Sequence, residues 1–224
     1  MTRTAIIAAF PGEVKSLVRG WPHGTRNGVD FWAQRDSEDE WIVSCAGAGQ
    51  SAATRAFTAI EDGGPVDLVF SVGWAGALTA GIATGTAHNV AGVIDVQTGE
   101  RFRCDAGAGE FWLATSPKVA DEAEKRRLAS AYHASLVDME AAAIARLAAM
   151  RAIPFYCIKG VSDGLSETLP DFNRFLGPDG KLQMGRLLVF AILHPWYWPA
   201  LVRMGENSTK AAQSIAESLH EFLR

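Results

Sequence analysis

Three acidic side chains lie where a buried segment ends or an alanine-rich helix begins, and these positions suit acid–base chemistry. Glu13 follows the apolar run Thr4–Phe10. Asp163 follows the apolar run Phe155–Val161, and Glu140 opens an alanine-rich segment. A carboxyl group held by its surroundings can give or take a proton. Because ligands of open α/β sheets bind beyond the carboxyl ends of the strands, the three groups can converge on one site.

Each acid also has a purely structural interpretation. Asp163 can cap a following helix, because Ser and Asp are favoured at helix N-termini. Glu13 can decorate a first helical turn, and Glu140 can be an exposed helical residue. Taken one at a time, the residues do not decide between structural and functional interpretations.

Glycine-rich turns follow two expected strands. Ala46-Gly47-Ala48-Gly49 fits a tight strand-to-helix turn or an anion cradle at a helix N-terminus. It lacks the third glycine of a dinucleotide fingerprint and the Lys of a P-loop. No HExxH or paired-histidine pattern occurs, and Cys45, Cys104 and Cys157 have no CxxC spacing. We therefore predict no metal site, no disulfide framework and no cofactor.

Apolar runs alternate with helical patterns along the chain, which indicates an α/β fold. We expect further strands at Val29–Arg35, Trp41–Ala46, Val66–Val72, Ala87–Val96 and Phe111–Thr115. We expect helices from the Gly47–Gly49 turn to Ile60 and at Ala120–Ala131, Met139–Arg151, Phe172–Leu176, Leu182–Leu193 and Ser208–Leu223. Without a repeat or a linker, residues 1–224 are predicted to form one domain, with 180–224 as its aromatic-rich helical extension.

Composition excludes several classes of function. Of 224 residues, 48% are hydrophobic, and the formal net charge of −4 argues against a broad nucleic-acid surface. The basic group Lys125–Arg127 is expected on the solvated face of a helix. Leu187–Val202 spans about 16 residues and is broken by prolines, whereas a bilayer-spanning helix needs roughly 20. We expect no signal peptide, no transmembrane segment and a cytoplasmic location.

Together these segments resemble the purine nucleoside phosphorylase/uridine phosphorylase superfamily, particularly its methylthioadenosine/S-adenosylhomocysteine nucleosidase branch. The most specific piece is Val137-Asp138-Met139-Glu140-Ala141-Ala142-Ala143-Ile144-Ala145, which is similar to a V-E-M-E-x-x-A-x-A helix start. The resemblance runs in chain order through Ile6–Val14, Ala46–Ala53, Gly73–Gly76, Val137–Ala145 and Lys159–Asp163. It implies a three-layer α/β/α fold around a mixed, partly barrel-like sheet, and cleavage of the bond between a purine base and ribose.

The resemblance also implies a role for each candidate residue. Asp163 corresponds to the acid that protonates the purine at N7, and Ser162 is expected to orient it. An acid that works at neutral pH must be partly desolvated. Glu140 corresponds to the residue that holds the ribose hydroxyls, with Met139 packed against the sugar. Glu13 corresponds to the carboxylate that positions and deprotonates the attacking water.

The nature of the nucleophile follows from the same comparison. Phosphorylases of this superfamily use glycine and arginine near the first turn, whereas Glu13 would repel a phosphate dianion. Hydrolysis is therefore favoured. Phosphorolysis, with phosphate as co-substrate, stays the alternative if Arg19, Arg55 or Arg101 reaches the site.

Two departures bear on the substrate. Trp74 stands in the Gly73–Gly76 turn where a small serine is usual, and the chain between Val96 and Phe111 is short. A narrower subgroup, the hopanoid-associated phosphorylases that act on adenosylhopane, is similar in the segments Val93–Phe102, Phe111–Val119 and Leu169–Phe175. This similarity implies adenine as the base, contacted near Thr115–Val119. The candidates for the base or anion site are Ser162, Gly73, Trp74, Pro117, Lys118 and Val119.

The aromatic segment Leu187–Trp198 has two interpretations. Trp and Tyr favour membrane interfaces, so the segment can grip a lipid-linked substrate or dock the enzyme at the inner membrane. It can equally pack on the core or at a dimer interface. The family resemblance implies at least a homodimer. Two alternatives stay open for the function. The substrate can be methylthioadenosine or S-adenosylhomocysteine, or the protein can be a non-catalytic nucleoside- or lipid-binding protein.

Overall fold

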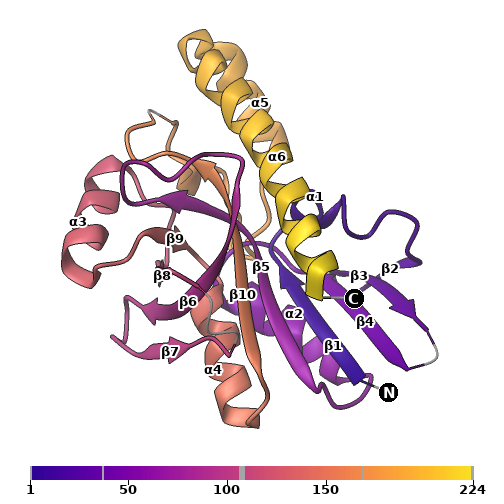
Figure 1. Cartoon of the computed structure of the whole chain (residues 1–224). Helices are drawn as coiled ribbons and strands as arrows, with labels where there is room; N and C mark the ends of the chain where they lie inside the picture. Colours follow the sequence, from indigo (N-terminus) through magenta and orange to yellow (C-terminus); the bar gives the residue numbers. More distant parts are fainter. Residues whose placement is uncertain (1, 37, 106–108, 168, 223–224) are drawn as a thin grey trace.

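A mixed β-sheet forms the centre of the computed structural model, which describes residues 2–36, 38–105, 109–167 and 169–222. Within those ranges the sheet has ten strands (Figure 1). They are β1 (Thr2–Ala8), β2 (His23–Arg26), β3 (Val29–Arg35), β4 (Asp39–Cys45), β5 (Leu68–Ala77), β6 (Ala87–Asp95), β7 (Arg101–Arg103), β8 (Phe111–Thr115), β9 (Leu136–Asp138) and β10 (Phe155–Asp163).

Part of the sheet closes on itself. Strands β10, β6, β8, β9 and β5 lie in that order, and β10 also pairs with β5, so these five form a ring. β1 continues from β5, and β4, β3 and β2 extend the open side of the sheet. Parallel pairs such as β1–β4 and β5–β10 alternate with antiparallel pairs such as β6–β10 and β3–β4. The predicted mixed, partly barrel-like sheet is confirmed.

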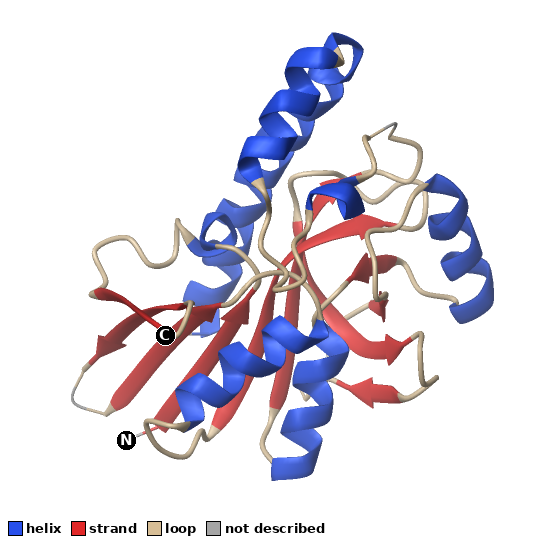
Figure 2. Cartoon of the chain, turned by 180° about the vertical axis from the view of Figure 1, so that it is seen from behind, coloured by secondary structure: helices blue, strands red, loops and turns tan. Residues whose placement is uncertain are grey.

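Helices cover both faces of the sheet, giving the three layers that were predicted (Figure 2). Helices α2 and α4 pack on one face, and α1 and α6 pack on the other. The helices are α1 (Pro11–Val14), α2 (Gln50–Glu61), α3 (Glu122–Tyr132), α4 (Ala141–Arg151), α5 (Met184–Leu193) and α6 (Trp198–Phe222), with 3₁₀ turns η1 (Phe172–Phe175) and η2 (Pro195–Tyr197).

Helix α6 has two halves with different surroundings. Its C-terminal half lies on β10, where small residues allow close contact: a Cβ placed at Gly160 would lie only 2.8 Å from the Cβ of Ala211. Its N-terminal half stands away from the body beside α5, and the two helices form a hairpin that projects from the molecule (Figure 1). The buried residues of α6 all come from Ser208 onward.

Several expected elements differ from those observed. The strands expected at Val29–Arg35 and Trp41–Ala46 are observed as β3 and β4, which pair antiparallel; residue 37, between them, lies outside the described residues. The helix expected at Phe172–Leu176 is a 3₁₀ turn. Helix α6 begins ten residues before Ser208, the expected start. Its first ten residues were not predicted as helix, because Trp198–Asn207 is apolar on several sides and shows no amphipathic pattern. The expected last residue, Leu223, also lies outside the described residues.

The prediction for the basic group Lys125–Arg127 is partly wrong. The side chains of Arg126 and Arg127 are exposed and pair with glutamates of their own helix, as expected. Lys125 is only 4% exposed and points into the molecule. The three residues lie about 100° apart around helix α3, so adjacent basic residues face opposite environments.

Candidate active site

A cavity of about 580 Å³ opens where β1, β4, β5, β9 and β10 end. This is the edge of the sheet at which the three acids were expected to meet. Of the sequence-predicted residues, Glu13, Trp74, Lys118, Val119, Met139, Glu140, Ser162 and Asp163 line the cavity. Gly73 and Pro117 do not belong to its lining. Gly73 nevertheless contacts the site, because it lies directly against the carboxyl group of Glu13.

Backbone N–H groups hold the carboxylate of Glu13 from three sides. Its Oε2 accepts hydrogen bonds from the backbone N of Ala9 (2.7 Å) and of Phe10 (2.9 Å), and its Oε1 accepts one from the backbone N of Trp74 (2.8 Å). A Cβ at Gly73, where φ is +136°, would lie 2.7 Å from Oε1, so only glycine fits there. Burial raises the pKa of Glu13, and the backbone hydrogen bonds offset part of that rise. Glu13 is thus a fixed, buried base.

Glu140 spans two elements at the cavity wall. It is the N-cap of α4, and its Oε1 accepts a hydrogen bond from the backbone N of Gly49 (2.6 Å) at the start of α2. The expected anion cradle at this helix N-terminus is therefore filled by a carboxylate of the protein itself. Burial, together with the nearby charge of Asp138, raises the pKa of Glu140 to about 8. The alternative of an exposed helical residue is wrong.

A buried ion pair, Asp138–Lys159, underlies the cavity floor and was not predicted from the sequence. The Nζ of Lys159 lies 2.9 Å from Oδ2 of Asp138, and both side chains are fully buried. Thr115 donates to Oδ1 of Asp138 at 2.7 Å, and the backbone N of Ala141 donates to Oδ2 at 2.9 Å. Burial alone would lower the pKa of Lys159, but the charge of Asp138 raises it above its ordinary value. The pair joins β9 to β10 with all polar atoms satisfied.

Asp163 ends β10 and has a partner on each carboxylate oxygen. The Oγ of Ser162 donates to Oδ1 at 2.6 Å, as the resemblance implied. Lys125, from α3, binds Oδ2 and also donates to the carbonyl of Gly164 at 2.6 Å. A β-bulge between Val161 and Asp163 turns the strand end toward the cavity. No helix follows directly in the described chain, so the interpretation of Asp163 as a helix cap is wrong.

Sequence reasoning missed Lys125 as a site residue. The available signal was its spacing from Leu128: residues three positions apart lie on one face of a helix. Both residues are buried in the structure. The neighbouring Arg126 and Arg127 obscured that signal. The result is a carboxylate–ammonium pair at the cavity wall, with the Asp163 side chain 14% exposed.

The segment expected to contact the base is divided between two roles. Thr115 and Ser116 are buried, and Thr115 is engaged with Asp138. Lys118 and Val119 face the cavity. The side-chain amide of Asn173 accepts from the backbone N of Val119 at 2.8 Å and donates to its carbonyl at 3.0 Å. Asn173 therefore ties η1 to this wall of the cavity.

Apolar side chains form the remaining walls. The indole of Trp74 packs beside Phe10 with ring centroids 6.5 Å apart, and its Nε1 donates to the carbonyl of Ser208 in α6 at 2.9 Å. Trp74 thus connects the cavity to α6 and has used its only side-chain N–H. Further apolar lining comes from the C-terminal segment, namely Phe172, Leu176, Leu182, Met184 and Met204.

The three arginines considered for phosphate do not line the cavity. The guanidinium of Arg55 donates to the carbonyls of Ala46 (3.1 Å) and Asp179 (2.8 Å). Arg101 lies over the ring of Trp112, 5.5 Å from its centroid. Among the described residues, no group of His, Cys, Asp and Glu is arranged to hold a metal ion.

Comparison with known proteins agrees with this geometry. Residues 96–188 match the phosphorylase superfamily. The matched stretch contains Glu140 and Asp163, whereas Glu13 lies outside it. No curated protein matches the chain by sequence.

Several solved structures share the fold of this chain over its whole length. A 5′-methylthioadenosine/S-adenosylhomocysteine nucleosidase from Helicobacter pylori is 16% identical, with 100% of this chain and 98% of that chain covered and a TM-score of 0.74. Futalosine hydrolase of Helicobacter pylori is 16% identical, with 99% of this chain and 97% of that chain covered and a TM-score of 0.75. The 5′-methylthioadenosine/S-adenosylhomocysteine nucleosidase from Neisseria meningitidis is 17% identical, with 100% of this chain and 99% of that chain covered and a TM-score of 0.72. These similarities establish the fold.

Proposed function

We propose that this protein is an N-glycosyl hydrolase that releases adenine from an adenine nucleoside. The observation that carries the proposal is the convergence of Glu13, Glu140 and Asp163, from three distant parts of the chain, on one cavity. The phosphorylase-superfamily match and the nucleosidase folds support the same reaction class. Hydrolysis of this bond passes through an oxocarbenium-like state, which needs a protonated leaving base, a stabilised ribose cation and a water activator.

In the proposed mechanism, the Lys125–Asp163 pair supplies the proton to the base. The proton moves from the pair to N7 of adenine as the electrons of the glycosidic bond pass to the base. Lys125 holds the carboxylate in place and is the source from which Asp163 is reprotonated. Ser162 fixes the other carboxylate oxygen, so the acid has one orientation.

Glu13 and Glu140 act on the ribose side. Glu13 takes a proton from water, whose oxygen then forms the new bond to C1′. Its raised pKa makes it a stronger base than an exposed glutamate. Glu140 accepts hydrogen bonds from the ribose hydroxyls, and in its ionised form it stabilises the positive charge that develops on the ring. Met139 lies beside it at the cavity wall and packs against the sugar.

For the substrate we favour a nucleoside with a bulky apolar 5′ substituent, adenosylhopane in hopanoid lipid biosynthesis. The apolar wall formed by Leu176, Leu182, Met184 and Met204 supports this choice, as does Trp74 in place of a small polar residue. Methylthioadenosine or S-adenosylhomocysteine is the alternative. It is supported by the names of the similar Helicobacter pylori and Neisseria meningitidis structures.

A single experiment tests reaction, substrate and nucleophile. Purified protein is incubated with adenosylhopane, methylthioadenosine or S-adenosylhomocysteine, each with and without phosphate, and released adenine is measured. We expect release without phosphate, because Arg19, Arg55 and Arg101 lie outside the cavity lining. A strict requirement for phosphate would instead establish phosphorolysis.

A variant separates an enzyme from a nucleoside-binding protein. Asp163→Asn should lose turnover by roughly 10²- to 10⁴-fold, the range of a general acid, and still bind adenine nucleosides. A wild type that binds nucleosides and releases no adenine would overturn the enzymatic proposal. We further propose that the protein is a homodimer, an inference that rests on the family resemblance and is tested by sedimentation. A cytoplasmic location is proposed from the cysteines, whose spacing supports no disulfide framework.

A further inference from the structure

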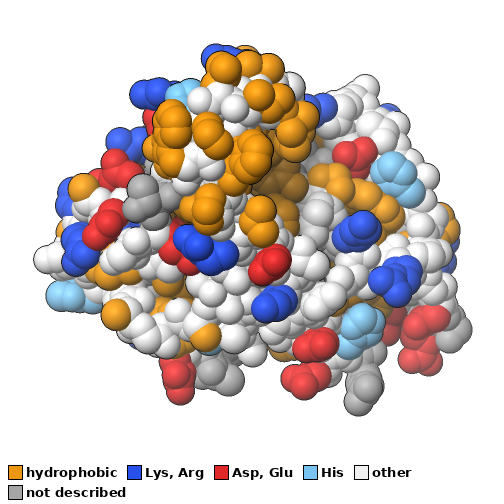
Figure 3. All heavy atoms as spheres, turned by 90° about the horizontal axis from the view of Figure 1, so that it is seen from above, with side chains coloured by type: hydrophobic (Ala, Val, Ile, Leu, Met, Phe, Trp, Pro, Cys, Tyr) orange, Lys and Arg blue, Asp and Glu red, His pale blue; other side chains and the backbone are white. Residues whose placement is uncertain are grey.

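The end of the projecting hairpin is covered with exposed apolar side chains. We call residues 187–202 the apolar tip; it comprises most of α5, η2 and the first turns of α6. Seen from above, the tip presents a cluster of hydrophobic side chains (Figure 3). Seven large ones are each more than half exposed, namely Leu188, Val189, Ile192, Leu193, Trp196, Trp198 and Val202. Such a concentration on a protruding element marks an interaction surface.

Charged residues surround the apolar tip and are absent from it. Between Arg186 on α5 and Arg203 on α6, the described chain contains no Asp, Glu, Lys or Arg. Both arginines are exposed, one on each helix where the tip begins. At 1.5 Å per residue the tip is on the order of 10 Å long, the depth to which interfacial helices enter the headgroup and acyl boundary. Arginines at that level match anionic lipid headgroups.

Two polar side-chain groups within the apolar tip find partners inside it. The Nε1 of Trp198 donates to the carbonyl of Ala191 at 2.7 Å. The Nδ1 of His194 lies 2.8 Å from the carbonyl of Phe190, whose ring stacks on the imidazole at 4.0 Å. The Trp198 bond ties the two helices together, and both contacts lower the cost of moving these groups from water into hydrocarbon.

We propose that the apolar tip inserts into one leaflet of an anionic lipid bilayer, with Arg186 and Arg203 at the headgroups. Among the described helices, none alone is long and apolar enough to span a membrane, although α5 with Pro195–Phe222 passes that test as a pair bent by 104°. The C-terminal half of α6 is packed on the sheet through residues such as Ala211 and Ile215. Only the tip is free to enter lipid, so the contact is peripheral.

The base of the apolar tip is continuous with the active-site cavity. Leu182 and Met184 precede the tip, Met204 follows it, and all three line the cavity. Insertion of the tip therefore brings the cavity mouth to the membrane surface. A nucleoside with a lipid 5′ substituent can then reach the cavity without its apolar part crossing water. The lipid contact itself does not depend on the proposed reaction, and is measured without it.

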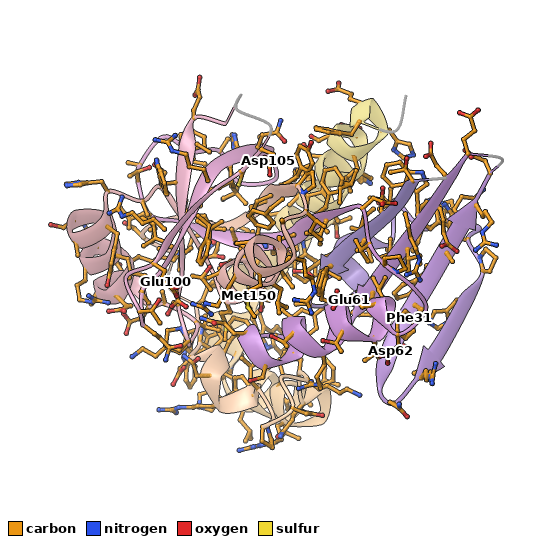
Figure 4. All side chains as sticks on the ribbon, turned by 90° about the horizontal axis from the view of Figure 1, so that it is seen from below. Phe31, Glu61, Asp62, Glu100, Asp105 and Met150 are labelled. Atoms are coloured by element: carbon orange, nitrogen blue, oxygen red, sulfur yellow. The ribbon has the colours of Figure 1, made fainter. Side chains whose placement is uncertain are left out.

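Vesicle flotation with the full chain tests the proposal. The protein is mixed with vesicles of phosphatidylcholine alone or of phosphatidylcholine with one third phosphatidylglycerol, and the floated fraction is measured. The variant Ile192→Ser/Trp196→Ser removes two apolar tip residues. Met150→Ser is the matched control, because Met150 is 75% exposed on α4, on the underside of the molecule (Figure 4). Arg203→Glu tests the charge, with the exposed Arg26→Glu as its control.

We expect wild type and both controls to float with the anionic vesicles. The Ile192→Ser/Trp196→Ser variant should bind about tenfold less, and Arg203→Glu should lose its preference for phosphatidylglycerol. Circular dichroism and adenine release from a water-soluble nucleoside should be unchanged, because Ile192 and Trp196 are outside the cavity. Wild type that stays unbound, or a double variant that floats like wild type, would overturn the proposal. A tip variant that converts a dimer to a monomer, with no wild-type flotation, would assign the tip to a second copy of the chain.

Discussion

Burial determines the chemistry of the acidic side chains in the cavity. Glu13 and Glu140 sit among backbone N–H groups and apolar walls, and burial raises the pKa of each. Lys159 and Lys125 place positive charge close by, one under the floor and one at the wall. The site therefore holds several carboxyl groups in a small volume without uncompensated charge.

Replacing Glu140 separates its catalytic role from its effect on stability. The unfolded carboxyl titrates near its ordinary value of 4.5, whereas the folded pKa is about 8, so the native state binds more protons and loses stability as pH rises between them. Glu140→Gln removes this loss. We expect the variant to unfold at a higher temperature than wild type at pH 9, with little difference at pH 5, and to be nearly inactive. Thermal unfolding by circular dichroism at both pH values checks this, and a constant difference would contradict the assigned burial.

Replacing Lys125 tests the ammonium partner of Asp163. Lys125→Met keeps the apolar stem and removes the charge that binds Oδ2. We expect kcat for adenine release to fall roughly 10²-fold, with a much smaller change in KM, because the group acts on proton delivery. The neighbouring Arg126→Met serves as control, since Arg126 is exposed and paired within α3. An equal fall in kcat in both variants would show that the effect comes from the total charge of α3 and not from the contact between Lys125 and Asp163.

The three acids could be predicted because each belongs to a local pattern that the sequence displays. Lys125 and the Asp138–Lys159 pair could not be predicted in the same way. Their partners come from distant elements, 38 positions apart for Lys125 and Asp163, and only the closed sheet brings them together. A charged residue is buried only when it has a partner, and the hydrophobic periodicity of the sequence does not reveal that partner.

At the scale of elements, long strands and helices were predictable and short ones were not. β7 and β9 have three residues each, too few to show an alternating pattern. β9 nevertheless carries Asp138 and leads directly into Met139 and Glu140. Ring closure by β5 and β10 depends on pairing between parts of the chain far apart in sequence, which composition and periodicity do not specify.

The buried ion pair holds β9 against β10, and its removal should be costly. Lys159→Met leaves Asp138 charged and without its ammonium partner in a dry environment, so we expect a loss of about 3–5 kcal/mol in the free energy of unfolding. The double variant Asp138→Asn/Lys159→Met removes both charges and should recover part of the loss. Urea unfolding of the double variant and of the single variants Lys159→Met and Asp138→Asn measures the coupling. Losses that simply add would contradict a direct pair.

At the scale of the whole molecule, the cavity lies between a rigid body and a projecting hairpin. The catalytic acids come from strand ends and from helices packed on the sheet, whereas Leu182, Met184 and Met204 come from the hairpin. Under the proposed function, the body supplies the chemistry and the hairpin supplies the surface for the 5′ substituent. Insertions or substitutions in the hairpin can change substrate preference while the acids stay in place.

A charged residue in the apolar wall should discriminate between substrates. Met204→Asp places a carboxylate where an apolar 5′ chain is expected to lie. We expect KM for a nucleoside with a long apolar 5′ chain to rise about tenfold or more, and KM for adenosine to change little. Steady-state kinetics on the two substrates measures this. Equal effects on both would place the 5′ chain elsewhere.

The closed ring also constrains the order in which the protein becomes functional. Glu13 leaves the ribosome early, but Asp163 takes its place only when β10 pairs with both β5 and β6, and Met204 follows later still. Contacts between such distant segments form slowly. We expect nascent chains that end before β10 to expose an incomplete barrel to chaperones. Nucleoside binding would then report synthesis beyond Met204, since no fragment that ends earlier contains the whole cavity lining.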